Sequence, residues 1–247
     1  MLTNCSPSEV GERFRALQAH LRSLWQGIEL IEPYDRDILV VPSLSLDQRE
    51  LHKIEAFHYY EERLLFALIR LRNPQTRLIY VTSQPVHPSI IDYYLQFTAG
   101  IPYSHVRDRL LLLSTYDLSQ KPLTQKILER PRLLNQIRQA LRPELSYMVC
   151  YNSSALERDL SLELEVPLFG LDPDLLYLGT KGGSRQLFAE VGIPFPDGSE
   201  SLKSVTELAQ ATGELWERQP HAHKFVIKLN EGISGEGNAV LHLEAMK

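Results

Sequence analysis

Hydrophobic positions along this chain alternate between the spacing of a helix and that of a buried strand. Apolar residues recur at every third or fourth position over 7–26, which predicts an amphipathic helix. The continuous apolar run over 37–43 is typical of a strand that is covered on both faces. Asp47 and Glu50 then form a D-x-x-E capping box, which predicts the start of a long helix that ends at Asn73.

The same strand-then-helix unit recurs further along. We predict strands over 77–83, 110–115, 147–151 and 166–169, with helices over 88–97, from Pro131 onward, and over 154–160. Strands that alternate with helices favour an α/β fold, here a Rossmann-like, mainly parallel sheet covered by helices. We expect this first domain to comprise residues 1–174.

Residues 175–247 are expected to form a smaller α+β domain. One helix is predicted over 184–191, and a second follows an S-x-x-E capping box formed by Ser204 and Glu207, with Gly213 as a candidate break in it. The last stretch predicts a β-hairpin, because two β-rich runs flank a glycine-rich turn.

The turn of this hairpin has the composition of an anion-binding loop. Glycines let backbone N–H groups converge without interference from Cβ atoms, and short polar side chains can help to hold phosphate oxygens. A lysine beside such a loop supplies a point charge for a phosphate. The residues concerned are Lys228, Gly232, Ser234, Gly235, Gly237 and Asn238. An ordinary loop has the same composition, so the hairpin alone leaves both interpretations open.

A second segment lies upstream of the hairpin. It contains Lys181, two glycines, the predicted helix, and the sequence Gly192-Ile193-Pro194-Phe195-Pro196. In this order, the two segments resemble the ATP-grasp superfamily, in which a lysine ahead of a helix ending in G-[VI]-P-x-P is followed by a strand lysine and a flexible glycine-rich loop. More narrowly, the chain is similar to the N-terminal part of pheganomycin-type peptide ligases, which carry a pre-ATP-grasp domain ahead of these motifs.

The resemblance implies an ATP-dependent carboxylate–amine ligase that activates a carboxylate as an acyl phosphate. ATP and small carboxylate and amine substrates would be its ligands, and Lys181 and Lys228 would hold the α- and β-phosphates. Mg²⁺ is the implied metal, but the family's magnesium ligands lie in a lobe that follows the loop and that this chain does not contain. The resemblance therefore assigns no catalytic residue and no metal ligand here, and we expect residues 1–247 alone to be inactive.

Two other classes of function stay open. The chain could be a naturally truncated, non-catalytic nucleotide-binding protein, or a partner-binding module whose first domain docks a subunit that supplies the missing lobe. A homo-oligomer is compatible with either. An exposed apolar face around Leu241 and Leu243 would favour a ligase fragment or a partner-binding module, because an unpaired strand edge promotes association.

Composition narrows the classes further. The chain has 247 residues, of which 43% are hydrophobic and 23% charged, so it can bury a sizeable core. A formal net charge of −5 argues against sequence-independent binding of nucleic acid. No apolar run has transmembrane length, and the N-terminus is too polar for a signal peptide, so we expect a cytoplasmic protein without membrane contact. Of the two cysteines, Cys5 lies near the N-terminus and Cys150 is predicted to be a small buried hydrophobe.

Ligands of parallel sheets bind outside the carboxyl ends of the strands, which puts 82–88 and 152–154 on the expected functional edge. The first of these loops contains His87. We interpret it as a strand-to-helix connection, with a pocket for the carboxylate substrate or the nucleotide as the alternative. His105 is interpreted as a surface histidine.

Two further patterns are given structural interpretations. Over 55–63, helical spacing predicts that Phe57, Tyr60 and Leu64 face a core, whereas Glu61 and Glu62 are expected to form a solvated face. The pair His221 and His223 has no third metal ligand nearby and is assigned to a loop.

Overall fold

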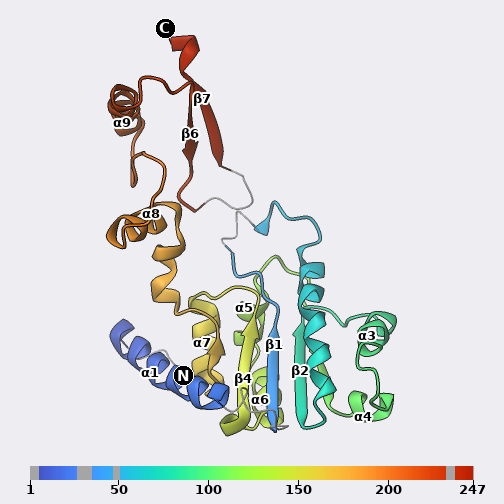
Figure 1. Cartoon of the computed structure of the whole chain (residues 1–247). Helices are drawn as coiled ribbons and strands as arrows, with labels where there is room; N and C mark the ends of the chain where they lie inside the picture. Colours follow the sequence, from blue (N-terminus) through green and yellow to red (C-terminus); the bar gives the residue numbers. More distant parts are fainter. Residues whose placement is uncertain (1–5, 27–34, 47–50, 232–236, 247) are drawn as a thin grey trace. The chain divides into compact units, whose positions relative to one another are not determined.

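The computed structural model describes residues 6–26, 35–46, 51–231 and 237–246, and the chain divides into two units, Met1–Pro173 and Asp174–Lys247 (Figure 1). The first unit contains a sheet of five strands in the order β3-β2-β1-β4-β5, and all four pairings are parallel. The predicted parallel α/β fold is therefore confirmed. Its elements are α1 (Pro7–Gln26), β1 (Arg36–Val41), η1 (Phe57–Arg72), β2 (Thr76–Thr82), α3 (Pro88–Leu95), α4 (Tyr103–Arg107), β3 (Leu110–Ser114), α5 (Leu123–Leu128), α6 (Pro131–Ala140), η2 (Pro143–Leu145), β4 (Ser146–Cys150), α7 (Ala155–Leu164) and β5 (Leu168–Phe169).

The central strand β1 is buried along its whole length, which explains its continuous apolar sequence. Successive side chains of a strand point to opposite faces, so the sheet has two cores. Leu39 and Val41 pack in the core formed with α5, α6 and α7, whereas Ile38 and Val40 pack in the core formed with η1, α3 and α4. The side-chain amide of Gln18, from α1, covers the open edge of β5. Its Nε2 donates to Leu168 O at 2.7 Å, and its Oε1 accepts from Leu168 N at 2.8 Å.

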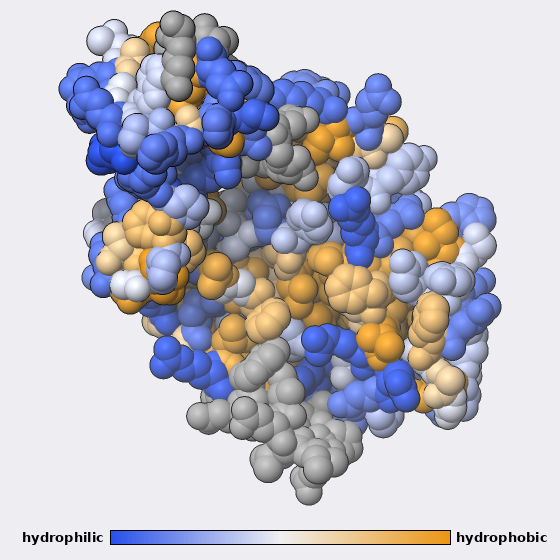
Figure 2. Space-filling model, turned by 45° about the horizontal axis from the view of Figure 1, so that its top comes forward, coloured by the Kyte–Doolittle hydropathy of each residue, from blue (hydrophilic) through white to orange (hydrophobic). Residues whose placement is uncertain are grey.

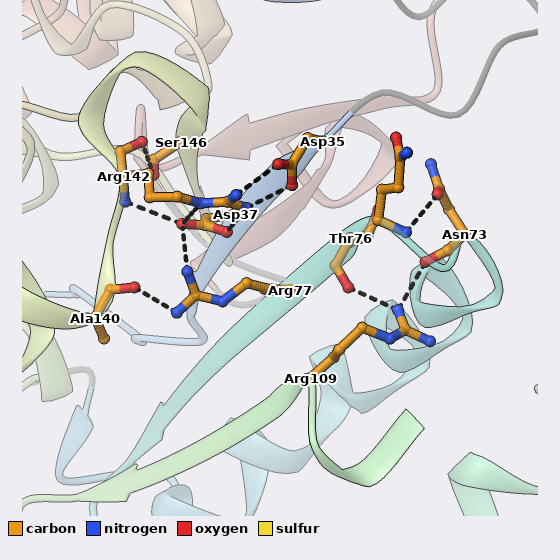
Figure 3. Close-up of polar contacts among 10 residues, drawn as sticks. Asp35, Asp37, Asn73, Thr76, Arg77, Arg109, Ala140, Arg142 and Ser146 are labelled. Carbon is orange, nitrogen blue, oxygen red and sulfur yellow. Dashed lines mark hydrogen bonds and ion pairs between the residues drawn. The ribbon is translucent and has the colours of Figure 1, made fainter. Parts of the chain in front are cut away.

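The amino ends of the strands are tied together by arginines (Figure 3). Asp37 of β1 is fully buried, and its carboxylate accepts from the Arg142 guanidinium at 2.6 and 3.0 Å and from Arg77 at 3.4 Å. Arg142 also donates to Asp35 at 2.6 and 2.7 Å, which lowers the pKa of that carboxyl. The hydrogen bonds to Asp37 and to Asp35 together raise the pKa of Arg142. Arg109 donates to the main-chain oxygens of three residues, two of which, Asn73 and Thr76, are labelled in Figure 3. This edge of the sheet is thus occupied by structural contacts.

The helix predicted to follow Asp47 differs from expectation. That capping box lies outside the described residues, and the helix that the structure describes is the long 3₁₀-helix η1. In a 3₁₀-helix, residues three apart lie on one line along the helix. Leu65, Leu68 and Leu71 therefore form a continuous buried line against the sheet.

The described residues of the second unit form a two-stranded antiparallel sheet and two α-helices. The predicted hairpin is confirmed, and Lys228 is the last residue of its first strand, where it pairs with Asn238. Gly213 does not break its helix, which continues to Arg218. The elements are η3 (Pro173–Gly179), α8 (Lys181–Glu190), α9 (Val205–Arg218), β6 (Lys224–Lys228), β7 (Asn238–His242) and η4 (Leu243–Met246). In the part of the chain that the structure describes, no helix is long and apolar enough to cross a membrane.

Candidate functional site

Lys181, the first lysine of the motif, is the first residue of α8. The sequence predicted a helix start at Ser184, because glycine is a poor helix former and two glycines precede that residue. Two hydrogen-bond acceptors at the helix start offset the low helix propensity of these glycines. The Thr180 hydroxyl accepts from Gly183 N at 3.0 Å, and the side-chain oxygen of Asn230 accepts from Gly182 N at 2.9 Å. The helix therefore begins three residues earlier, and Lys181 lies within its first turn.

The start of α8 is bonded to the residues that directly follow Lys228. Lys181 Nζ donates to the carbonyl oxygen of Leu229 at 2.8 Å, and Lys181 N donates to that of Asn230 at 3.3 Å. Lys181 and Lys228 are 47 positions apart in the sequence. Tertiary contacts thus bring the first lysine to the end of the strand that carries the second.

The start of the second hairpin strand, β7, also lies next to the residues that follow Lys228. Leu229 N donates to Gly237 O at 2.8 Å, directly after the pair formed by Lys228 and Asn238. Gly237 has a φ of +71°, and an added Cβ would lie 2.6 Å from Leu229 Cδ1, so this position requires glycine. The other loop residues assigned from the sequence, Gly232, Ser234 and Gly235, lie outside the described residues.

The proline-rich sequence after α8 closes that helix and packs back on it. Gly192 has a φ of +71°, and the next residue, Ile193, donates its N–H to Phe188 O at 2.9 Å. Arg185 of α8 donates to Pro196 O at 2.8 Å, lies 4.8 Å from the ring centroid of Phe195, and forms an ion pair with Glu200. The motif therefore holds the helix whose first turn carries Lys181.

One face of the hairpin is exposed, and it does not contain Leu241 or Leu243. Leu243 is only 1% exposed, because η4 follows β7 and Leu243 N donates to His223 O, and Leu241 is partly buried. The exposed apolar face around these two leucines that would have favoured a ligase fragment or a partner-binding module is therefore not observed among the described residues. The exposed face instead carries Lys228 together with the cross-strand pair Val226 and Val240.

The first unit has a second polar region, at the carboxyl ends of β2 and β3. Glu61 was expected to be solvated, but it is buried and accepts from Ser83 Oγ at 2.6 Å and also from Ser83 N. The fully buried Lys126 of α5 donates to Ser83 Oγ at 2.9 Å and to Asp117 O at 2.8 Å. Burial raises the pKa of Glu61 and lowers that of Lys126, while each charge opposes the shift of the other.

A sequence signal for the buried glutamate exists. Glu61 is four residues after Phe57 and four before Leu65, both of which are buried, so helical spacing places it on the apolar side. Its charge led to the opposite prediction. Charged side chains are rarely buried unless they are paired, and the partners here come from segments distant in sequence. Phe57 faces a core as expected, and Tyr60 and Leu64 pack partly against one.

Another buried carboxylate, that of Glu157, lies at the carboxyl ends of β1 and β4, where the strand order reverses. Glu157 accepts from Thr124 Oγ1 and Ser154 Oγ, both at 2.6 Å, and from Ser45 Oγ. Ser45 and Asn152 also exchange hydrogen bonds at 3.0 and 3.1 Å, which ties the two strand-end loops together. This is the position at which open α/β sheets bind ligands.

The segments assigned to the functional edge do follow the carboxyl ends of β2 and β4. Exposed apolar side chains beyond the strand ends include Leu118, Tyr151 and Leu171. Figure 2 shows that apolar residues also gather on the molecular face turned toward the viewer. His87 caps α3, with its Nδ1 accepting from Ser89 N at 3.3 Å, which supports its interpretation as part of a strand-to-helix connection.

The remaining candidates occupy structural positions. His105 is exposed in α4, and His223 pairs with Glu244 at 2.8 Å. Cys150 is a free thiol packed against the core, where burial raises its pKa. Within the described ranges, no group of three or more histidine, cysteine, aspartate or glutamate side chains could hold a metal ion.

Comparison with known proteins gives two distant relatives. The chain is 29% identical to an L-propargylglycine–L-glutamate ligase of Streptantibioticus cattleyicolor over 83% of its own length and 44% of the ligase. It is 23% identical to IQ motif-containing protein H of Danio rerio, over 95% of its own length and 24% of that protein. The chain thus spans less than half of either relative. No family model matches it, and no solved structure shows significant similarity.

Proposed function

We propose that this chain supplies the phosphate-binding part of an ATP-dependent ligase that joins a carboxylate to an amine. The observation that carries the proposal is the contact between Lys181 and the end of β6, which gathers two lysines and the flanking glycines at one end of the hairpin. The similarity to a protein named as an amino-acid ligase supports the same class of reaction.

In the proposed reaction, a carboxylate oxygen of one substrate attacks the γ-phosphorus of ATP, and the bond to the β,γ-bridging oxygen breaks. ADP and an acyl phosphate result. The amine of the second substrate then attacks the acyl carbon, phosphate leaves, and the nitrogen loses a proton to give the amide. Negative charge on the phosphate oxygens must be balanced during transfer. Lys181 and Lys228 are the residues of the second unit to which we assign part of that role.

Backbone geometry supports close approach of phosphates to this region. Gly182 and Gly183 lie in the first turn of α8, where the lack of Cβ atoms lets a ligand come close to the backbone and the helix dipole favours an anion, while their N–H groups donate to Asn230 and Thr180. Gly237 and Asn238 line the other side of the strand end. Mg²⁺ accompanies ATP in reactions of this class, but the described residues contain no cluster suited to a metal, so we assign it no ligand in this chain.

Direct measurement of ATP binding tests the proposal. Isothermal titration calorimetry should show that the wild-type chain binds ATP and that Lys181→Ala combined with Lys228→Ala weakens binding about a hundredfold or more, because two charge-assisted hydrogen-bonding groups are lost. Lys224→Ala is the matched control, since Lys224 is exposed at the opposite end of the same strand. Equal ATP affinity of the double variant and the control would place the nucleotide elsewhere.

The ligase assignment has its own readout. The wild-type chain, and any longer form purified from its source, are each incubated with ATP, Mg²⁺ and amino acids. The form that carries the complete site should yield ADP and an amide product, which mass spectrometry detects. ATP binding without amino-acid-dependent ADP formation in every form would instead favour the non-catalytic nucleotide-binding alternative.

A further inference from the structure

Asn230 makes the contacts that connect the two lysine-bearing elements, and no motif in the sequence singles it out. Its side-chain oxygen accepts from Gly182 N at 2.9 Å, and its main-chain oxygen accepts from Lys181 N at 3.3 Å. The preceding carbonyl, that of Leu229, accepts from Lys181 Nζ at 2.8 Å. Two consecutive residues of the hairpin therefore hold the backbone and the ammonium group of Lys181.

The contact is specific to the side chains present. A Cβ added at Gly182 would lie 3.1 Å from Asn230 Oδ1, a separation tighter than most such contacts, so the glycine leaves room for the amide to reach the helix start. The first-turn N–H groups of a helix lack partners within the helix, and Asn230 satisfies those of Lys181 and Gly182 from a segment distant in sequence.

The chemistry of the side chain matters as much as its reach. An asparagine oxygen accepts a hydrogen bond while the side chain remains neutral, whereas an aspartate in the same place would bring a negative charge beside the lysines. At a helix start such a charge would stabilise the helix but repel a bound phosphate. A neutral acceptor orients the helix start without opposing an anionic ligand.

We propose that Asn230 is a positioning residue of the phosphate site, which fixes Lys181 and the first turn of α8 against the end of the strand that carries Lys228. This inference rests on the proposed function. It assigns to Asn230 no contact with the nucleotide; its effect on ATP passes through the placement of Lys181.

Two substitutions separate positioning from simple structural support. Asn230→Ala removes the side-chain acceptor and should weaken ATP binding about tenfold, because one hydrogen bond that orders the site is lost. Asn230→Asp keeps the acceptor, so the Gly182 amide should stay protected from hydrogen exchange. Its ATP affinity should nevertheless fall at low salt and recover toward that of the wild type as salt screens the added charge.

The control is Gln210→Ala, which removes an exposed amide that donates to Glu214 in α9 of the same unit. ATP affinity and Gly182 exchange should both be unchanged in this variant. Calorimetry at low and high ionic strength, together with amide exchange measured by NMR, covers all four proteins.

The outcomes distinguish this inference from the proposed function. If Asn230→Ala binds ATP as tightly as the Gln210→Ala control, Asn230 does not position the site, while the lysine variants still decide the proposed function. If Asn230→Asp binds ATP as tightly as the wild type at low salt, no phosphate lies near this residue and the inference is wrong. If the wild-type chain does not bind ATP, both the proposed function and the positioning role of Asn230 are wrong.

Discussion

The buried pair formed by Glu61 and Lys126 allows a quantitative test of how the first unit is held together. The two charges are bridged by the Ser83 hydroxyl, which donates to Glu61 at 2.6 Å and accepts from Lys126 at 2.9 Å. Lys126 Nζ also lies 5.3 Å from the ring centroid of Phe57. Replacement of Lys126 by Met preserves much of the side-chain volume and removes the charge, because the ammonium group is lost and one methylene becomes a thioether sulfur.

The expected cost follows from the charge that is left behind. In Lys126→Met, Glu61 stays buried without an opposite charge, and removal of one partner of a buried pair destabilises by about 3–5 kcal/mol. The Ser83 donors that remain on Glu61 place the expected value near the lower end of this range. In the double variant with Glu61→Gln neither charge remains, so its cost should be smaller than the sum of the two single costs by about 2 kcal/mol.

Native-state hydrogen exchange of β2 amides measures these free energies within the first unit. Lys121→Met is the matched control, because Lys121 pairs with Glu129 at 2.8 Å while both side chains are 41% exposed, and an exposed pair contributes less than about 1 kcal/mol. A cost for Lys126→Met no larger than that of the control would refute the reasoning. So would single-variant costs that add to the double-variant cost within about 0.5 kcal/mol.

The pH dependence provides an independent check with a definite sign. Burial raises the pKa of Glu61 above its unfolded value, so the folded state binds the proton more tightly, and stability contributed by this group falls as pH rises through the folded pKa. Loss of Lys126 removes a charge that lowers this pKa, so the penalty of the variant should be greatest at neutral pH. It should diminish on acidification as Glu61 becomes protonated.

Two further predictions concern acid stability and glycine positions. Burial of Asp117 acts against ionisation, but hydrogen bonds from Ser119 and Arg130 prevail and lower its pKa to about 2. The ionised carboxylate should therefore contribute about 2 kcal/mol to the free energy of unfolding, and this contribution should be lost as pH falls from about 4 to 2. Asp117→Asn should remove this step from acid unfolding curves. Gly213→Ala should stabilise α9 by about 0.5–1 kcal/mol, since the added Cβ would meet nothing within 4 Å. Gly183→Ala should instead destabilise the second unit by about 1–3 kcal/mol, because the added Cβ would lie 1.9 Å from Tyr177 O. Amide exchange in the second unit measures both glycine variants, and a stabilised Gly183→Ala would contradict the observed geometry.

The sequence alone determined the α/β class, the order of the strands and of most helices, and the sequence positions of the two motif lysines, although α4 and α5 were not predicted. These features are local: continuous apolar runs predict buried strands, three-to-four spacing predicts helices, and glycine with β-branched neighbours predicts a hairpin. Each depends on residues within about ten positions of one another, so each can be recognised without knowledge of the fold. The early start of α8 was missed because one of its two stabilising acceptors, Asn230, lies on another element, although the other, Thr180, is the adjacent cap residue.

Only the tertiary structure decided which polar residues are buried and which segments meet. Glu61 has a charged side chain on an apolar line, and its burial depends on donors from Ser83 and on the charge of Lys126. Lys181 reaches the end of the strand of Lys228 through contacts with Leu229 and Asn230. A buried charge or a buried helix terminus needs partners, and where those partners are distant in sequence, the fold rather than local sequence determines where they lie.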